Sequence, residues 1–213
     1  MAAPSQRRAY WLKTLHQWHW ISSALSLLGL LLFTLTGFTL NHATQIESKP
    51  QVSTRSAQLP PSLLTGIGAA ENTNGKTGKA PPAPLPPAVA TWIASELKLD
   101  VGGRTAEWSP EEIYLSLPRP GGDAWLRIAR DTGELEYERT DRGWVSYLND
   151  LHKGRNTGAA WNWFIDLFAL ACLVFAITGL FILKMHAANR PSTWPVVALG
   201  LVLPLLLAIL FIH

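Results

Sequence analysis

The chain has 213 residues, of which 48% are hydrophobic and only 15% are charged. Soluble proteins carry about 25% charged residues, so this composition argues against an ordinary soluble enzyme. The net charge of +3 includes lysines and arginines that flank apolar runs on one side, a pattern of membrane insertion and not of nucleic-acid binding.

Three apolar runs are long enough to cross a bilayer as helices, which takes about 20 residues. The expected transmembrane helices are residues 20–42, 163–184 and 194–213. The first run is longer than a signal-peptide core and is followed by no clear A-x-A site, so we expect an uncleaved anchor. Pro204 is expected to kink the third helix.

Basic residues flank these helices mainly on one side. They are Arg7, Arg8, Lys13, Lys184 and Arg190. The positive-inside rule then predicts a cytoplasmic tail over residues 1–19 and a cytoplasmic loop over residues 185–193. With three membrane crossings, the segment 43–162 and the C-terminus lie on the opposite side.

The segment between the first two helices consists of three parts with different sequence patterns. Residues 43–87 are rich in proline and predict an extended, semi-rigid linker that forms no core. Residues 88–142 predict a small α+β domain, with a helix followed by a meander of strands. The expected helix is 88–99, and the expected strands are 104–109, 112–118, 124–130 and 134–139. Residues 143–162 then predict an amphipathic helix, 144–153, and a loop at the outer membrane surface.

All six histidines lie at or near the ends of the expected membrane helices. The topology sorts them into an inner trio of His16, His19 and His186, and an outer trio of His42, His152 and His213. Neutral imidazoles from two neighbouring helices are what a six-coordinate b-type haem requires. The chain has no C-x-x-C-H motif, so covalent attachment of haem is excluded.

Other roles for these histidines stay open. His16 and His19, three residues apart, form an H-x-x-H pair that suits a metal bound on one helix face. An interfacial histidine can also serve only as an amphipathic residue or hydrogen-bond partner, and His213 at the chain end fits that role best. His19 and His42 are separated by about 34 Å of helix, which would place two irons near opposite membrane faces.

Two further residues in the second transmembrane helix bear on function. Apart from Lys184 at the end of the second helix, Asp166 is the only charged residue inside an expected membrane helix. It is therefore a functional candidate, with pairing to Arg155 or Lys153 as the alternative. Cys172 is the only cysteine, so the chain has neither a disulfide framework nor a cysteine metal site.

Several short motifs resemble the PepSY-associated transmembrane helix proteins. These motifs are LHQWHW (15–20), TGFTLNH (36–42), DLHKGRNTG (150–158) and ITGL (177–180), and the 88–140 unit with its DTGEL turn resembles a PepSY domain. Larger members resemble inner-membrane dihaem reductases that release iron from siderophores in the periplasm. The resemblance implies haem ligands at His16 or His19, His42 and His152, whereas His186 is a candidate by position alone.

The resemblance implies a bacterial inner-membrane protein with a periplasmic PepSY-like domain, a periplasmic C-terminus and one or two haem b groups. Electrons would come from quinol or a cytoplasmic reductase and pass to a ferric siderophore or a periplasmic flavoprotein. Larger members commonly have at least four membrane helices, so a chain with three is a candidate for a homodimer or for assembly with an added partner. The alternatives are a non-enzymatic anchor whose PepSY unit binds or inhibits a periplasmic protein, and a small subunit of an iron-uptake assembly.

Overall fold

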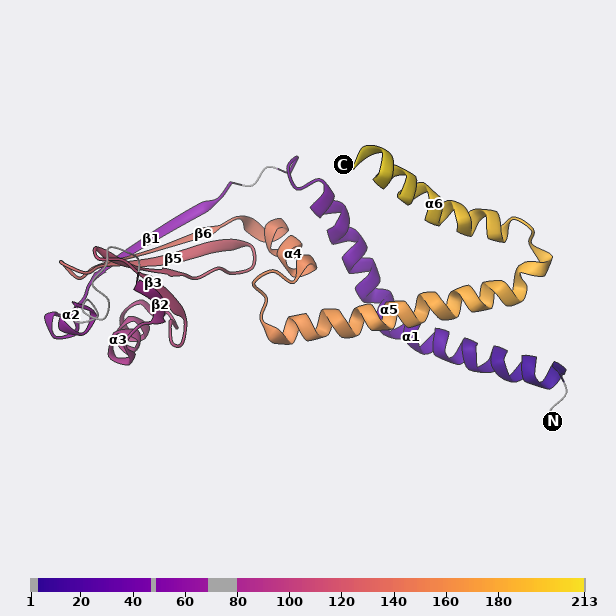
Figure 1. The fold of residues 1–213 in the computed structure, drawn as a ribbon, viewed down its shortest axis with the longest axis horizontal. Helices are drawn as coiled ribbons and strands as arrows, with labels where there is room; N and C mark the ends of the chain where they lie inside the picture. The colour runs from indigo at the N-terminus through magenta and orange to yellow at the C-terminus, as the bar shows by residue number, and fades with distance from the viewer. Residues whose placement is uncertain (1–3, 47–48, 69–79, 213) are drawn as a thin grey trace. The chain divides into compact units, whose positions relative to one another are not determined.

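The computed structural model describes residues 4–46, 49–68 and 80–212 (Figure 1). The chain forms two compact units that share the first helix. A helical unit joins this helix up to residue 35 with the chain from residue 160 onward. A sheet unit runs from residue 36 to residue 159.

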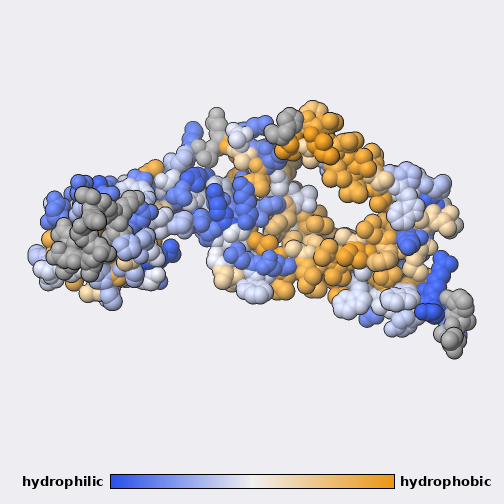
Figure 2. Space-filling view, viewed as in Figure 1, coloured by the Kyte–Doolittle hydropathy of each residue, from blue (hydrophilic) through white to orange (hydrophobic). Residues whose placement is uncertain are grey.

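Three helices are long and apolar enough to cross a membrane. They are α1 (Pro4–Asn41), α5 (Ala159–His186) and α6 (Thr193–Phe211). Figure 2 shows hydrophobic residues over the surfaces of α5 and α6, and largely hydrophilic residues over the sheet unit. The predicted membrane protein with three transmembrane helices is therefore confirmed. Helix α6 continues through Pro204, and the kink expected there stays a prediction.

Helix α1 begins at Pro4, so residues 4–19 of the predicted tail are helical, and their location in the cytoplasm stays a prediction. Proline is favourable in the first turn of a helix, and no glycine or second proline interrupts residues 5–28. His16 and His19 therefore lie on the same continuous helix as the apolar run that follows them.

Helices α1 and α5 approach each other closely at Gly29. A Cβ atom at Gly29 would lie 2.5 Å from Cε2 of Phe168, and the ring of Phe33 stacks on the same phenylalanine at 4.9 Å. Lipid tails are as apolar as the helix surfaces, so the hydrophobic effect does not drive membrane helices together. Close approach at a small residue instead provides van der Waals packing energy. Gly29 therefore serves helix packing.

The sheet unit contains a six-stranded antiparallel sheet in the order β1-β6-β5-β4-β3-β2. The strands are β1 (Gln51–Gln58), β2 (Ala80–Pro84), β3 (Thr105–Trp108), β4 (Glu112–Ser116), β5 (Gly122–Ala129) and β6 (Glu134–Asp141). Alternate residues of β5, including Leu126 and Ile128, are buried, as expected for a sheet with one covered face.

Two helices cover that face (Figure 1). Helix α3 (Pro87–Leu97) buries Val89, Ile93 and Leu97, which recur every four residues on one side of the helix. Helix α2 (Pro61–Gly68) adds Ile67. The predicted α+β fold of this unit is confirmed, and its helix and four central strands lie within a few residues of the expected bounds.

The prediction that residues 43–87 form a linker without a core is wrong for the residues that the structure describes. This segment supplies β1, α2 and β2, and it buries Leu59, Ile67 and Leu85 in the core. Both strands are edge strands, where a polar sequence and prolines are tolerated because one side of the strand has no partner. The central part of the segment, residues 69–79, lies outside the described residues.

Helix α4 (Gly143–Lys153) follows β6 and belongs to the sheet unit. Its Asp150 is 2% exposed and accepts hydrogen bonds from the backbone N–H of Gly121 at 2.8 Å and from Nε of Arg155 at 2.8 Å. These bonds fix the helix to the β4–β5 turn and to the chain after its C-cap. Arg155, considered above as a partner of Asp166, is therefore bound to Asp150.

Candidate functional site

His152 in α4 is held against a threonine–glycine pair in α1. Its Nδ1 atom lies 2.8 Å from Oγ1 of Thr36. A Cβ atom at Gly37 would lie 3.5 Å from Cε1 of the same ring. One turn further, Oγ1 of Thr39 donates to Oδ1 of Asn149 at 3.0 Å. Both α4 residues thus contact the end of α1 within the sheet unit.

His19 in α1 makes the corresponding contact in the helical unit, with a threonine–glycine pair in α5. Its Nδ1 atom lies 3.1 Å from Oγ1 of Thr178 and 3.2 Å from the carbonyl oxygen of Phe175. A Cβ atom at Gly179 would lie 3.3 Å from Cε1 of the ring, and Phe175 stacks on it at 4.6 Å. The ring therefore packs into the α1–α5 contact.

His16 and His186 are brought together from α1 and α5. Their ring centroids are 6.2 Å apart and the ring planes are nearly perpendicular, at 88°. Two imidazoles that bind opposite sides of one metal ion at about 2 Å have ring centres roughly 6 Å apart. The observed spacing therefore suits two rings that would hold one metal ion between them.

Both rings also line a cavity of about 510 Å³ in the helical unit, together with Arg190 and Thr193. Arg8 donates to the carbonyl oxygen of Met185 at 3.2 Å and so ties the start of α1 to the last turn of α5. The cavity is therefore bounded by α1 and α5, which this bond ties together, and by residues 190–193 that follow them. Arg190 makes it suitable for a ligand with carboxylate groups.

Hydrogen bonds to backbone carbonyls determine which ring nitrogen carries the proton. Nδ1 of His16 bonds the carbonyl of Leu12 at 2.8 Å, and Nδ1 of His186 bonds that of Ile182 at 2.9 Å. A carbonyl oxygen can only accept, so Nδ1 is the donor and a neutral ring keeps its lone pair on Nε2. This is the arrangement in which an outer hydrogen bond orients a metal-binding imidazole.

His42 does not share this arrangement with His152. Its Nδ1 donates to the carbonyl of Phe38 at 3.0 Å, and its ring lies 4.5 Å from the Phe38 ring. His42 is the first residue after the end of α1 at Asn41. Helical spacing of about 100° per residue, extended by this one residue, places it roughly 120° around the axis from Thr36, the residue that contacts His152. His213 lies outside the described residues.

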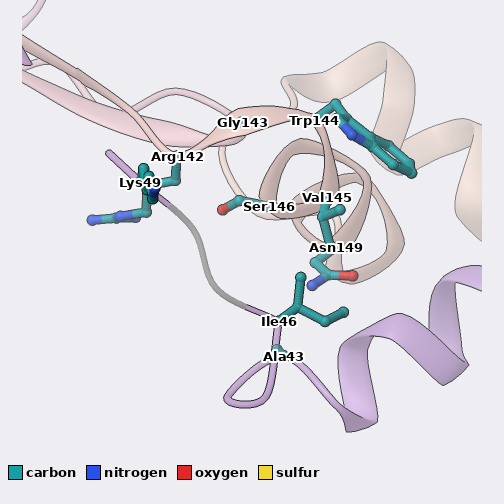
Figure 3. Close-up of a pocket in the computed structure, with 9 residues that line it drawn as sticks. All are labelled: Ala43, Ile46, Lys49, Arg142, Gly143, Trp144, Val145, Ser146 and Asn149. Atoms are coloured by element: carbon teal, nitrogen blue, oxygen red, sulfur yellow. The ribbon is translucent and has the colours of Figure 1, made fainter. Parts of the chain in front are cut away.

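Other site types find less support. Within residues 4–46, 49–68 and 80–212, no group of three or more His, Cys, Asp or Glu side chains is placed to hold a metal ion. A second cavity of about 370 Å³ lies between the chain after α1 and the start of α4, and Figure 3 shows Lys49 and Arg142 on one side of it and Trp144 on the other. None of its lining residues is a histidine.

Comparison with known proteins identifies one family. The family described as putative PepSY_TM-like matches residues 10–213. The chain belongs to this family. The match includes all three membrane helices and the whole sheet unit, so the resemblance in the short motifs extends over nearly the full chain. No curated protein and no solved structure matches the chain.

Two features of the site were not predicted from the sequence. Gly37 and Gly179 each follow a threonine that contacts a histidine ring. Arg190, interpreted only as a basic residue that flanks a membrane helix, lines the cavity beside His16 and His186. The repeated Thr-Gly dipeptide near the end of two membrane helices is the signal that points to the first feature.

Proposed function

We propose that this chain is a haem b electron-transfer protein of the bacterial inner membrane, and that His16 and His186 bind the iron. The observation that carries the proposal is the 6.2 Å separation of these two rings from different helices. Each ring donates from Nδ1 to its own helix, which leaves Nε2 as the metal-binding nitrogen. The support is local and lies entirely within the helical unit.

The surroundings of the pair suit a haem with two propionate groups. Arg190 lines the same cavity. The neighbouring chain also carries Arg8 and Lys13 and contains no acidic residue within 1–20 or 184–193. Cationic side chains balance propionate charge and stabilise the oxidised and reduced states to different extents. When bound, haem would supply one-electron redox chemistry.

The direction of electron flow follows from the expected orientation. With the N-terminus in the cytoplasm, His16 and His186 lie at the inner membrane face, where quinol or a cytoplasmic reductase would donate. The periplasmic sheet unit would dock the acceptor, a ferric siderophore or a periplasmic flavoprotein. His42 faces away from Thr36, so we propose one haem per chain. A homodimer would be needed to bring a second ligand to His42.

The test is the visible spectrum and the haem-to-protein ratio of the full-length chain purified in detergent from haem-replete cells. We expect a Soret band and a reduced α band with about one haem per chain. His16→Ala and His186→Ala should each remove most of the haem. Lys184→Gln, in the same last turn of α5 but outside the cavity lining, is the control and should retain it.

A colourless preparation would contradict the proposal and favour the non-enzymatic anchor or the uptake subunit. Retention of full haem in both histidine variants, with a loss in His42→Ala or His152→Ala instead, would contradict the assigned ligands. In that case the electron-transfer proposal survives and the inner pair does not bind the iron.

A further inference from the structure

A cationic pocket lies on the sheet unit, just past the C-terminal end of α3. Its volume is about 240 Å³. Its polar side chains come from β1, β6 and the C-cap of α3, and they are Ser53, Arg55, Lys98, Tyr137 and Arg139. Leu97 and Leu99 complete the lining. The histidines described above take no part in it.

The pocket arises because α3 ends before the sheet face does. The β1–β6 register pairs Ala57 with Leu135, then Arg55 with Tyr137, then Ser53 with Arg139. Because alternate residues share a face, these three pairs lie in a row on the face that α3 covers. Leu135 and Tyr137 pack in the core, whereas Arg55 and the Ser53–Arg139 pair line the pocket beyond it.

The helix ends abruptly at Lys98, whose φ of 56° and ψ of 38° are left-handed. Arg55 donates from Nη1 to the carbonyl oxygen of Leu97 at 3.3 Å and so offsets the negative end of the helix dipole. The turn leaves an open corner between α3 and the strands. Two arginines and one lysine line this corner.

Three cationic side chains line the pocket, and one acid beside it neutralises part of their charge. Asp141 forms ion pairs with Arg119 at 2.8 Å and with Arg139 at 3.6 Å. Arg119 is its closer partner, and Asp141 itself is not among the lining residues. Every polar side chain that lines the pocket can donate a hydrogen bond, and none of the described lining residues is a carboxylate.

We propose that this pocket binds a small anion that carries carboxylate or phosphate groups. Arginine guanidinium groups present paired N–H donors that match the two oxygens of a carboxylate or phosphate. The hydroxyl of Tyr137 adds a neutral donor on the same face, whereas the hydroxyl of Ser53 donates to the carbonyl oxygen of Arg139 at 3.5 Å. The volume suits a ligand group of a few heavy atoms and not a folded partner. This proposal is independent of haem binding.

The test is isothermal titration calorimetry of the full-length chain in a zwitterionic detergent, with citrate in one arm and inorganic phosphate in the other. We expect saturable one-to-one binding in at least one arm, and the stronger arm identifies the chemical group. Arg139→Gln and Lys98→Gly should each weaken this binding about tenfold. Lys98→Gly also keeps the left-handed backbone favourable, so loss of binding there is not loss of folding.

Arg127→Gln is the matched control, because Arg127 lies on the opposite face of β5 and its loss changes the net charge by the same amount. It should leave the affinity unchanged. Equal weakening by Arg127→Gln would show that general surface charge attracts the anion, and would overturn the proposal. Absence of saturable binding in both arms would also overturn it, and would leave Arg55 with the helix-capping role alone.

Discussion

Oγ1 of Thr36 lies 2.8 Å from Nδ1 of His152, and the next residue of α1, Gly37, leaves room for the edge of the imidazole ring. Thr178 and Gly179 in α5 make the same contact with His19. Each threonine–glycine pair therefore provides one polar partner and one position without a side chain. In both contacts, a histidine of one helix packs against a threonine and a glycine of another helix.

Replacement of Thr36 by valine should destabilise the sheet unit. Thr36 is 7% exposed, and valine keeps its shape but leaves Nδ1 of His152 without this partner. The expected cost is about 1–2 kcal/mol, seen as a fall of several degrees in Tm in detergent. Thr34→Val is the control, because the exposed Thr34 hydroxyl bonds only within its own helix, to Leu30. Equal losses in both variants would argue against the contact.

Asp150→Ala should be among the most damaging single changes in α4. Asp150 is buried and accepts from Arg155 and from the backbone of Gly121, so alanine leaves these donors unpaired. We expect a loss of about 2–4 kcal/mol in chemical denaturation. Asp123→Ala removes the acid of a surface pair with Arg142 and should cost less than about 1 kcal/mol. The account fails here if the two variants are equally stable.

Alanine substitutions at Gly121 and Gly143 distinguish two destabilising effects of a side chain at positive φ, which are backbone strain and steric overlap. Both have a left-handed backbone, with φ of 75° and 81°, but only at Gly121 would a Cβ lie 2.8 Å from Cβ of Tyr147. Alanine should cost roughly 1–2 kcal/mol at Gly143 from the backbone alone. At Gly121 we expect about 1–3 kcal/mol more, because Tyr147 and its backbone must shift. Thermal unfolding of both variants measures the difference.

Asp141 should give the sheet unit an acid-dependent contribution to stability. A hydrogen bond from the backbone N–H of Gly143, together with the charges of Arg119 and Arg139, lowers the pKa of Asp141, and these effects outweigh opposing desolvation. A lowered pKa in the folded state stabilises the fold above the ordinary value of 3.8.

This stabilisation is lost as the pH falls from that ordinary value through the lowered one. The difference in Tm between the wild type and Asp141→Asn should therefore be constant near neutral pH and shrink below about pH 4. An unchanged difference across the acid range would show that Asp141 stabilises the fold without its charge.

The parts of the fold that could be predicted are those with a strong local pattern. The apolar runs of α1, α5 and α6 can be recognised from their length. Helix α3 and strand β5 can be recognised from hydrophobic residues that recur about every four and every two positions. Strand β1 could not be found because QVSTRSAQ is polar and exposed on nearly every residue. Strand β2 was hidden by its prolines. Both depend on pairing with distant strands and not on local preference.

From the sequence, the histidines of the site could be placed only near the ends of the membrane helices. His16 and His19 are three residues apart, and the sequence does not distinguish them. In the structure, the rotation of α1 against α5 places His19 in the notch at Thr178 and Gly179 and leaves His16 beside His186. That rotation is set by packing between residues such as Gly29 and Phe168. These contacts cannot be identified from the sequence of either helix alone.

The central proposal is that His16 and His186 bind one haem iron from opposite sides. Low-temperature electron paramagnetic resonance of the oxidised, purified chain tests it most directly. We predict a low-spin ferric signal in the wild type, and its loss or conversion to a high-spin signal in both His16→Ala and His186→Ala. No ferric haem signal in the wild type, or an unchanged low-spin signal in both variants, would contradict this account.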